Sequence, residues 1–275
     1  MIRRMIVVDI KEGMREVRWW LVSATLLFAV QSASLFLSAS AQDLPATFSL
    51  GEHLFSYLEG MLPFTDGADN AFHLPIAWTV LTLYGTYLTL WYPANSLAGF
   101  GRQLLVAARS RWAWWLSKCL WVLLVCIAYC GIGFAVACVA TGVTGGSLEI
   151  AAPDNLVKLY GWDQQARYNP GAAAAFLLFV PLSLASICTV QLAASIFISP
   201  ALAFALTISQ LFFAAFFHLV PILPGNHLMA ARNLALFPDG YDPVLGIVLS
   251  LAIIDICVLV GGSAFSRLDI LTKEH

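Results

Sequence analysis

The residue best placed for proton chemistry is Asp255, an acid near the middle of a long apolar run. A carboxylate inside a membrane is costly, so it would face a bundle interior, become protonated or pair with another group. One hypothesis is a proton-coupling or substrate-contact site. The other, which we favour, is a protonated side chain hydrogen-bonded to a neighbouring helix, because a proton-driven transporter usually offers several buried ionisable groups. Candidate polar partners in the other apolar runs are Gln31, Gln191, Gln210 and His218.

Two further patterns could suggest catalytic or metal chemistry. Ser263 follows Gly261 and Gly262, but no histidine or acid is placed to activate its hydroxyl, so this run indicates helix packing. Cys126 and Cys130 lie one helical turn apart without an accompanying histidine or acid, which favours small core residues over half of a metal site. Neither a phosphate-binding loop nor an H-E-x-x-H motif occurs. We therefore expect no catalytic centre and no cofactor in this chain.

Composition identifies the elements that carry these residues. Of 275 residues, 60% are apolar and 11% are charged, whereas a soluble globular protein has roughly a quarter charged residues. The net charge of −2 gives no indication of nucleic-acid binding. We predict an all-α integral membrane protein in which residues 1–275 form a single transmembrane domain.

Six apolar runs are each close to the ~20 residues that a helix needs to cross a bilayer. With both termini in the cytoplasm, eleven of the fourteen lysines and arginines fall in cytoplasmic segments and three in outside loops. This bias is the one expected of membrane proteins. The predicted transmembrane helices cover residues 19–37, 74–92, 119–141, 172–192, 201–220 and 244–264.

The segments between the spans carry the remaining patterns. Residues 1–18 predict an amphipathic interfacial helix with an apolar stripe at Ile6, Ile10, Met14 and Val17, turning into the first span. Pro93 is expected to end the second span.

The two outside segments carry turn and capping signals. Ser49 and Glu52 match a capping box that would start a short helix on the outer interface or over the bundle. Residues 221–243 hold several prolines around an apolar helical piece at 227–236, which predicts a hairpin that re-enters the bundle or lies on it.

The cytoplasmic segment 95–118 is basic and contains no acid. Its charges are Arg102, Arg109, Arg111 and Lys118. Its apolar stripe has helical spacing, so the segment predicts an amphipathic helix. That helix would lie in the headgroup layer or dock into a groove on a cytoplasmic partner. The stripe consists of Leu104, Leu105, Ala108, Trp112 and Trp115.

Together these features resemble the permease subunit of ATP-binding cassette transporters of the type-2, exporter-like class. The resemblance covers essentially the whole chain and rests on four features. They are the N-terminal interfacial helix, the basic segment from Gly101-Arg102-Gln103 to Ser117-Lys118 at the position of the family's coupling helix, the Ser199-Pro200-Ala201 link, and the proline-rich outside hairpin. The family often has Asn-Pro where this chain has Ser199-Pro200.

The resemblance implies a mechanism that needs other chains. Phe100, Leu104 and Leu105 would insert into a groove on a separate ATPase subunit, Arg102 and Arg109 would pair with acids at its rim, and Arg111 would belong to the same coupling surface. ATP and Mg²⁺ would be bound by that partner, so this chain would not itself be an enzyme. A second permease copy, or a similar chain, would complete a pathway in the inner (plasma) membrane of a bacterium. Surrounded by lipid, the pair would export a lipid-like or peptide substrate.

Three alternatives remain at this point. A non-transporting sensor or immunity subunit would share the fold and still bind an ATPase. A proton-coupled secondary transporter would use Asp255 and need no ATPase. An intramembrane enzyme would need a nucleophile, a base and an orienting group close together, and the sequence offers no such set.

Overall fold

The computed structural model describes residues 2–62, 74–99, 110–162, 165–217 and 221–267, together with Gly101, Gln103 and Leu105. Some residues named in the predictions lie outside this part, among them Phe100, Arg102, Leu104, Arg109 and His218. Within it the regular structure is helical, apart from one isolated bridge between Asn233 and Tyr241.

Four helices of the described part are long and apolar enough to cross a membrane, as is typical of an all-α membrane protein. A fifth apolar helix, α9, has 17 residues, and at 1.5 Å per residue it is about 25 Å long. That is slightly less than the ~30 Å hydrocarbon thickness of a bilayer. The four long helices are α1 (Ile2–Ala41), α6 (Arg111–Thr144), α8 (Pro170–Ala194) and α10 (Pro243–Arg267), and α9 covers Pro200–Phe216.

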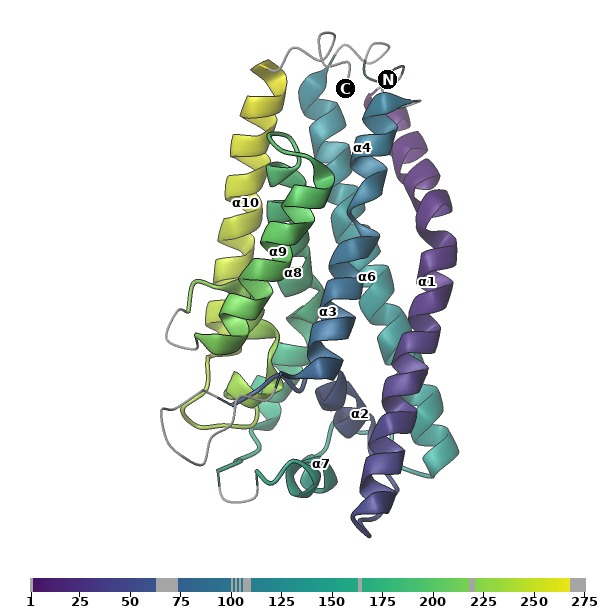
Figure 1. Ribbon diagram of the computed structural model, residues 1–275, viewed down its shortest axis with the longest axis vertical. Helices are drawn as coiled ribbons and strands as arrows, with labels where there is room; N and C mark the ends of the chain where they lie inside the picture. Colours follow the sequence, from purple (N-terminus) through teal and green to yellow (C-terminus); the bar gives the residue numbers. More distant parts are fainter. Residues whose placement is uncertain are drawn as a thin grey trace.

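The helices form one elongated bundle in which the chain alternates in direction (Figure 1). It runs down α1, up α3 (Ile76–Leu88) and α4 (Trp91–Ala98), down α6, up α8, down α9 and up α10. The upper end of the bundle in Figure 1 is therefore where α1 and α6 begin and where α4 and α10 end. Helices α1 and α8 pack on α6, and α10 packs on α8 and α6.

Helix α1 runs without a break from Ile2 to Ala41, so no turn separates the predicted interfacial helix from the first span. The buried face also differs from the predicted stripe. It begins at Asp9, Gly13 and Val17 and continues with helical spacing to Ala39, whereas Ile6, Ile10 and Met14 are half-buried. The physical reason is that Asp9 has a charged partner on α6, described below. This contact holds the first turns of α1 against the bundle instead of along a membrane surface.

Pro93 does not end the second span as predicted, because α4 runs through it to Ala98. The regular helix is interrupted instead at Thr89 and Leu90, between α3 and α4. Pro93 is the third residue of α4, where the backbone N–H has no acceptor within the helix, so the missing donor is tolerated.

The lower end of the bundle is closed by α2 (Leu50–Tyr57) and α7 (Asp154–Leu159). The capping box is confirmed: Glu52 N–H donates to Ser49 Oγ, and Ser49 N–H donates to Glu52 Oε2 at 2.7 Å. Glu52 Oε1 also accepts the backbone N–H of Asn155, in the first turn of α7, at 2.9 Å. Most of α2 is buried between α1, α3 and α6, so it covers the bundle and is not a lipid anchor.

Residues 221–243 fold into two short 3₁₀ turns, η1 (Pro224–Leu228) and η2 (Ala230–Arg232), and not into the predicted helical piece at 227–236. The reason is the choice of hydrogen-bond acceptors for the backbone N–H groups. Ala230 N–H donates to Leu58 O and Ala231 N–H donates to Glu59 O, so donors that an α-helix would use internally tie this segment to the end of α2.

Because His53 on α2 is buried, we predict that the folded protein loses stability at acidic pH. The side chain is 1% exposed, and within the described part neither ring nitrogen has a hydrogen-bond partner. Burial lowers its pKa from 6.5 to about 4. The unfolded chain therefore binds a proton below pH 6.5 that the folded protein binds only near pH 4. Stability is full above pH 6.5 and falls by about 3 kcal/mol as the pH drops to 4.

The variant His53→Leu should abolish this loss in thermal unfolding of the detergent-solubilised protein between pH 7 and pH 4. Burial raises the pKa of Glu59 to about 7, which gives a slope of the opposite sign. The informative quantity is thus the difference between wild type and variant at each pH. Parallel curves for the two proteins would contradict the assignment to His53.

Candidate functional site

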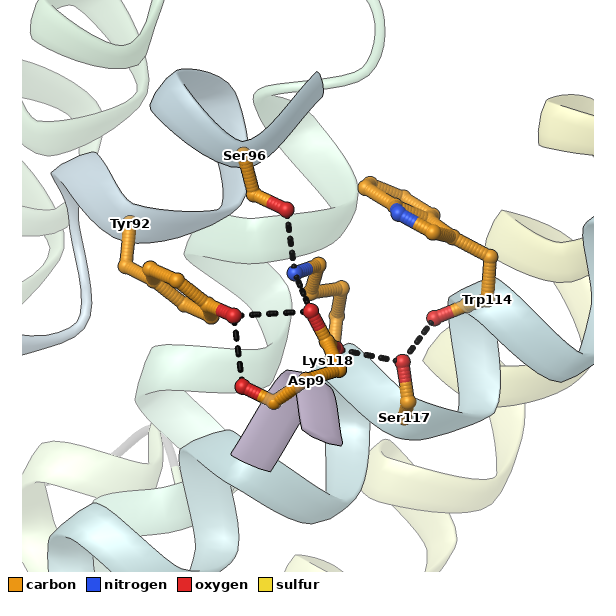
Figure 2. A network of polar contacts seen from close by, with 6 residues as sticks. All are labelled: Asp9, Tyr92, Ser96, Trp114, Ser117 and Lys118. Atoms are coloured by element: carbon orange, nitrogen blue, oxygen red, sulfur yellow. Dashed lines mark hydrogen bonds and ion pairs between the residues drawn. The ribbon is translucent and has the colours of Figure 1, made fainter. Parts of the chain in front are cut away.

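A buried ion pair joins α1 to α6 at the upper end of the bundle (Figure 2). Lys118 Nζ lies 2.5 Å from Asp9 Oδ1, and the two side chains are 0% and 2% exposed. Asp9 is the eighth residue of α1 and Lys118 is the eighth residue of α6, so each lies in the third turn of its helix. Their positions differ by 109 residues.

Both carboxylate oxygens of Asp9 and the ammonium group of Lys118 make further hydrogen bonds. Asp9 Oδ2 accepts the Ser117 hydroxyl at 2.6 Å, and Asp9 Oδ1 accepts the Tyr92 hydroxyl at 2.7 Å. Lys118 Nζ also donates to Ser96 Oγ at 2.7 Å. It lies 4.1 Å from the Tyr92 ring centre and 5.0 Å from the Trp114 ring centre, within the range of cation–π attraction.

We call these residues the Asp9 network; they are Asp9, Tyr92, Ser96, Trp114, Ser117 and Lys118. A buried ion pair offsets its desolvation only when its geometry is good and its other lone pairs and protons are satisfied, and both conditions hold here. The network therefore fixes α1, α4 and α6 relative to one another.

Close packing beside the network depends on Gly13. A methyl group at that position would lie 2.3 Å from Trp121 Nε1 and 2.5 Å from the Tyr92 ring. Since both distances are far below van der Waals contact, only glycine lets α1 approach α4 and α6 this closely. Asp9 and Gly13 lie one helical turn apart on the buried face of α1.

The Asp9 network contains residues from both ends of the basic segment 95–118. Ser96 lies in the last turn of α4, near the start of the segment, and Lys118 lies in α6, at its end. The predicted single helix is interrupted, because Ser110 has an extended backbone and caps α6 by accepting the N–H of Ala113. Trp112 and Trp115 of the predicted stripe therefore belong to α6.

Two of the predicted coupling residues lie in the described part. Leu105 is 8% exposed and belongs to the chain's own core. Leu105 would have to leave that core to enter a partner's groove, and its coupling role stays a prediction. Arg111 donates from Nη1 to the carbonyl of Ser266 at 2.9 Å. This contact places a cation at the C-terminus of α10, where the helix leaves carbonyls unpaired.

Three of the predicted intramembrane polar residues, Gln191, Gln210 and Asp255, lie in the described part, where no hydrogen bond joins any two of them. Gln191 is buried and donates from Nε2 to Thr86 O, which links α8 to α3. Gln210 is half-buried on α9. Asp255 is exposed on α10 and has no hydrogen bond or ion pair within the described part.

Of the three possibilities for Asp255, an orientation toward the interior of this chain's own bundle does not fit its exposure. Small residues at Gly246, Ser250 and Gly261 set the inward face of α10, and Asp255 lies off that stripe. The packing expectation for Gly261 is confirmed, since a methyl group there would lie 2.3 Å from the Trp115 ring.

The contacts of the Asp9 network are those of a structural link between helices. The described residues contain no group of three or more histidines, cysteines or acids that could hold a metal ion. Sequence reasoning missed Asp9 because its own helix suggested a surface position. The sequence does contain a signal for this ion pair. Asp9 and Lys118 are an acid and a base, and each lies in line with the residues on the buried face of its own helix. No protein-family model matches the sequence, and no curated protein matches it.

Proposed function

We propose that this chain is the membrane-spanning subunit of an ATP-driven transporter and crosses the membrane six times, with both termini in the cytoplasm. ATP and Mg²⁺ are bound by a separate ATPase subunit beneath the basic segment, and a second permease copy or a similar chain completes the pathway. The setting is the inner membrane of a bacterium, and the substrate exported is lipid-like or a peptide.

The observation that carries this proposal is the position of the Asp9 network. Its buried ion pair and hydrogen bonds connect Ser96, near the start of the basic segment, and Lys118, at its end, to Asp9 on α1. A displacement of the segment by a partner would therefore move α1, α4 and α6 together. An isolated surface helix in the headgroup layer would not need such a link.

Co-purification from native membranes in mild detergent tests the proposal, with bound proteins identified by mass spectrometry. The test variant is the double substitution Arg102→Glu, Arg109→Glu. The matched control is Lys158→Glu, Arg167→Glu, which makes the same charge change on two exposed side chains at the lower end. We expect an ATPase subunit with wild type and control, and its loss with the test variant, because charge reversal abolishes pairing with acids at the rim.

Two outcomes would contradict the proposal. If no ATPase accompanies the wild-type chain, the basic segment is not a coupling element and the proposal fails. If the ATPase is retained by the test variant, the two arginines do not form the contact, and the proposed coupling surface is wrong.

A further inference from the structure

A cavity of about 550 Å³ lies among α1, α2, α3, α6, α8 and η1, away from the Asp9 network. Its volume is within the ~300–1,000 Å³ of typical ligand sites. Among the described residues that line it, none is charged. Each of the six elements contributes to the wall, with Phe28, Tyr57, Leu81, Tyr129, Leu184 and Leu228 as examples.

The polar atoms of its two tyrosines are occupied by the protein itself. The Tyr57 hydroxyl lies 2.5 Å from Ser32 Oγ, and the Tyr129 hydroxyl donates to Leu81 O at 2.8 Å. A buried water needs two to four polar partners, and a headgroup would need similar ones. This wall is therefore suited to hydrocarbon.

The mouth of the cavity lies between α6 and α8. Its side chains Ile127, Phe134 and Leu178 are 48%, 49% and 71% exposed on the outside of the bundle. Both helices are long and apolar enough to cross a membrane. The medium that meets this mouth is thus the hydrocarbon of the bilayer, which can enter without passing through water.

Gly131 helps to keep the space open. A methyl group at this position would meet no other atom within 4 Å, although the residue lines the cavity. Pro181, inside α8, also lines the cavity.

We propose that this cavity binds one hydrocarbon chain of a membrane-resident lipid, which enters sideways between α6 and α8. The contacts are the dispersion and hydrophobic contacts of apolar walls. The headgroup stays outside the mouth, where no charged wall residue holds it. The proposal that the cavity binds a hydrocarbon chain depends on the cavity alone. The further statement that this lipid is the transported substrate rests on the proposed function.

Photo-crosslinking with the purified full-length chain in lipid nanodiscs tests the site. Two probes are used, a phosphatidylglycerol with a diazirine in one acyl chain and a free fatty acid with the same group. Adducts are located by mass spectrometry. We expect them in residues 127–134 and 174–184. The probe that labels at the lower concentration distinguishes a phospholipid from a free fatty acid as the source of the chain.

The test variant is Gly131→Phe and its control is Gly142→Phe. Both glycines lie on α6 and both have open space around the missing side chain, but Gly142 does not line the cavity. The aromatic ring removes cavity volume, so labelling should fall roughly tenfold in the test variant and stay unchanged in the control. If Gly131→Phe does not fold, Ala174→Leu fills the cavity from α8.

Labelling spread evenly over the exposed faces of α1 and α10, or unaffected by either cavity-filling variant, would overturn the inference. This outcome is distinguishable from failure of the proposed function, because the assay contains no ATPase. A chain can bind lipid here and still co-purify without an ATPase, or the reverse.

Discussion

Replacing Lys118 by methionine is expected to destabilise the folded protein by about 3–5 kcal/mol, because Asp9 would remain buried without its cation. The side chains are of similar length, so the main change is the loss of the ammonium group. Ser96 also loses its donor, and the cation–π contacts with Tyr92 and Trp114 disappear. The measurement is thermal unfolding in detergent, and a large decrease in Tm is expected.

A double-mutant cycle separates the ion pair from general packing. The variant Asp9→Leu should be destabilising on its own, whereas Asp9→Leu, Lys118→Met should recover most of the stability, since an apolar pair needs no desolvation of charge. The variant Lys158→Met is the matched control, because Lys158 is exposed. Additive effects of the two single substitutions would show that Asp9 and Lys118 do not act as a pair.

The same double variant connects stability with the proposed function. It restores an apolar contact between α1 and α6 but removes the hydrogen bonds to Tyr92, Ser96 and Ser117. Under the proposal, such a protein folds, yet a displacement of the basic segment is no longer passed to α1 through α4. ATP hydrolysis by the partner should then be poorly coupled to transport.

Hydrophobic periodicity was sufficient to predict most helices of this protein. The cores of α6, α8 and α10 contain the predicted spans 119–141, 172–192 and 244–264, because long apolar runs of this length have few other options. The capping box at Ser49 and Glu52 is a local pattern, and it too was predicted correctly.

Orientation about each helix axis was less predictable. Helix α10 is apolar on nearly every side, so its sequence does not specify which side faces inward, and in the structure Asp255 lies on the exposed side. In α1 the predicted stripe through Ile6 and Ile10 is apolar, but the buried face contains Asp9. Whether Asp9 is buried depends on Lys118, which is 109 residues away in the sequence. Local periodicity contains no information on a partner at such a sequence separation.

The candidate site shares this dependence on distant partners. Lys118 was recognised as basic, but it was grouped with Arg102 and Arg109 on a surface segment. Its burial follows from Gly13, which lets α1 come close, and from the aromatic rings of Tyr92 and Trp114. These contacts are tertiary, so a single sequence without its fold cannot reveal them.

Replacing Arg232 by methionine is the second substitution with a large expected effect. Arg232 is 2% exposed and lies in η2 at the lower end. Its guanidinium donates to the carbonyls of Ala214 and Ala215 at 2.5 Å each, and to Met61 O at 2.9 Å. The two alanine carbonyls belong to the last turn of α9, where no intrahelical donor remains. Arg232 therefore caps α9.

Arg232 also donates to Asn226 Oδ1 at 2.5 Å, and Asn226 in turn donates to Phe217 O, just past α9. Burial lowers the pKa of Arg232 to about 10, so the side chain keeps its charge at neutral pH. The positive charge is further favoured by the dipole at the C-terminus of α9.

Loss of these bonds should destabilise the protein by about 4 kcal/mol, since hydrogen bonds from a charged donor contribute roughly 1.5–3 kcal/mol each and orphaned carbonyls add to the loss. Thermal unfolding in detergent should show a decrease in Tm of roughly 10 °C. The variant Arg167→Met is the control, because Arg167 is exposed at the same end and its structural bond comes from its backbone N–H.

The variant Arg232→Lys decides whether charge or geometry matters. Lysine keeps the positive charge but has a single nitrogen, so it cannot reach acceptors on Met61, Ala214, Ala215 and Asn226 together. We expect Arg232→Lys to recover less than half of the lost stability. If it unfolds at the wild-type temperature, the charge at the end of α9 is sufficient and the planar fork of the guanidinium is not needed. If Arg232→Met itself is neutral, the hairpin at 221–243 is held by its apolar contacts and not by this cap.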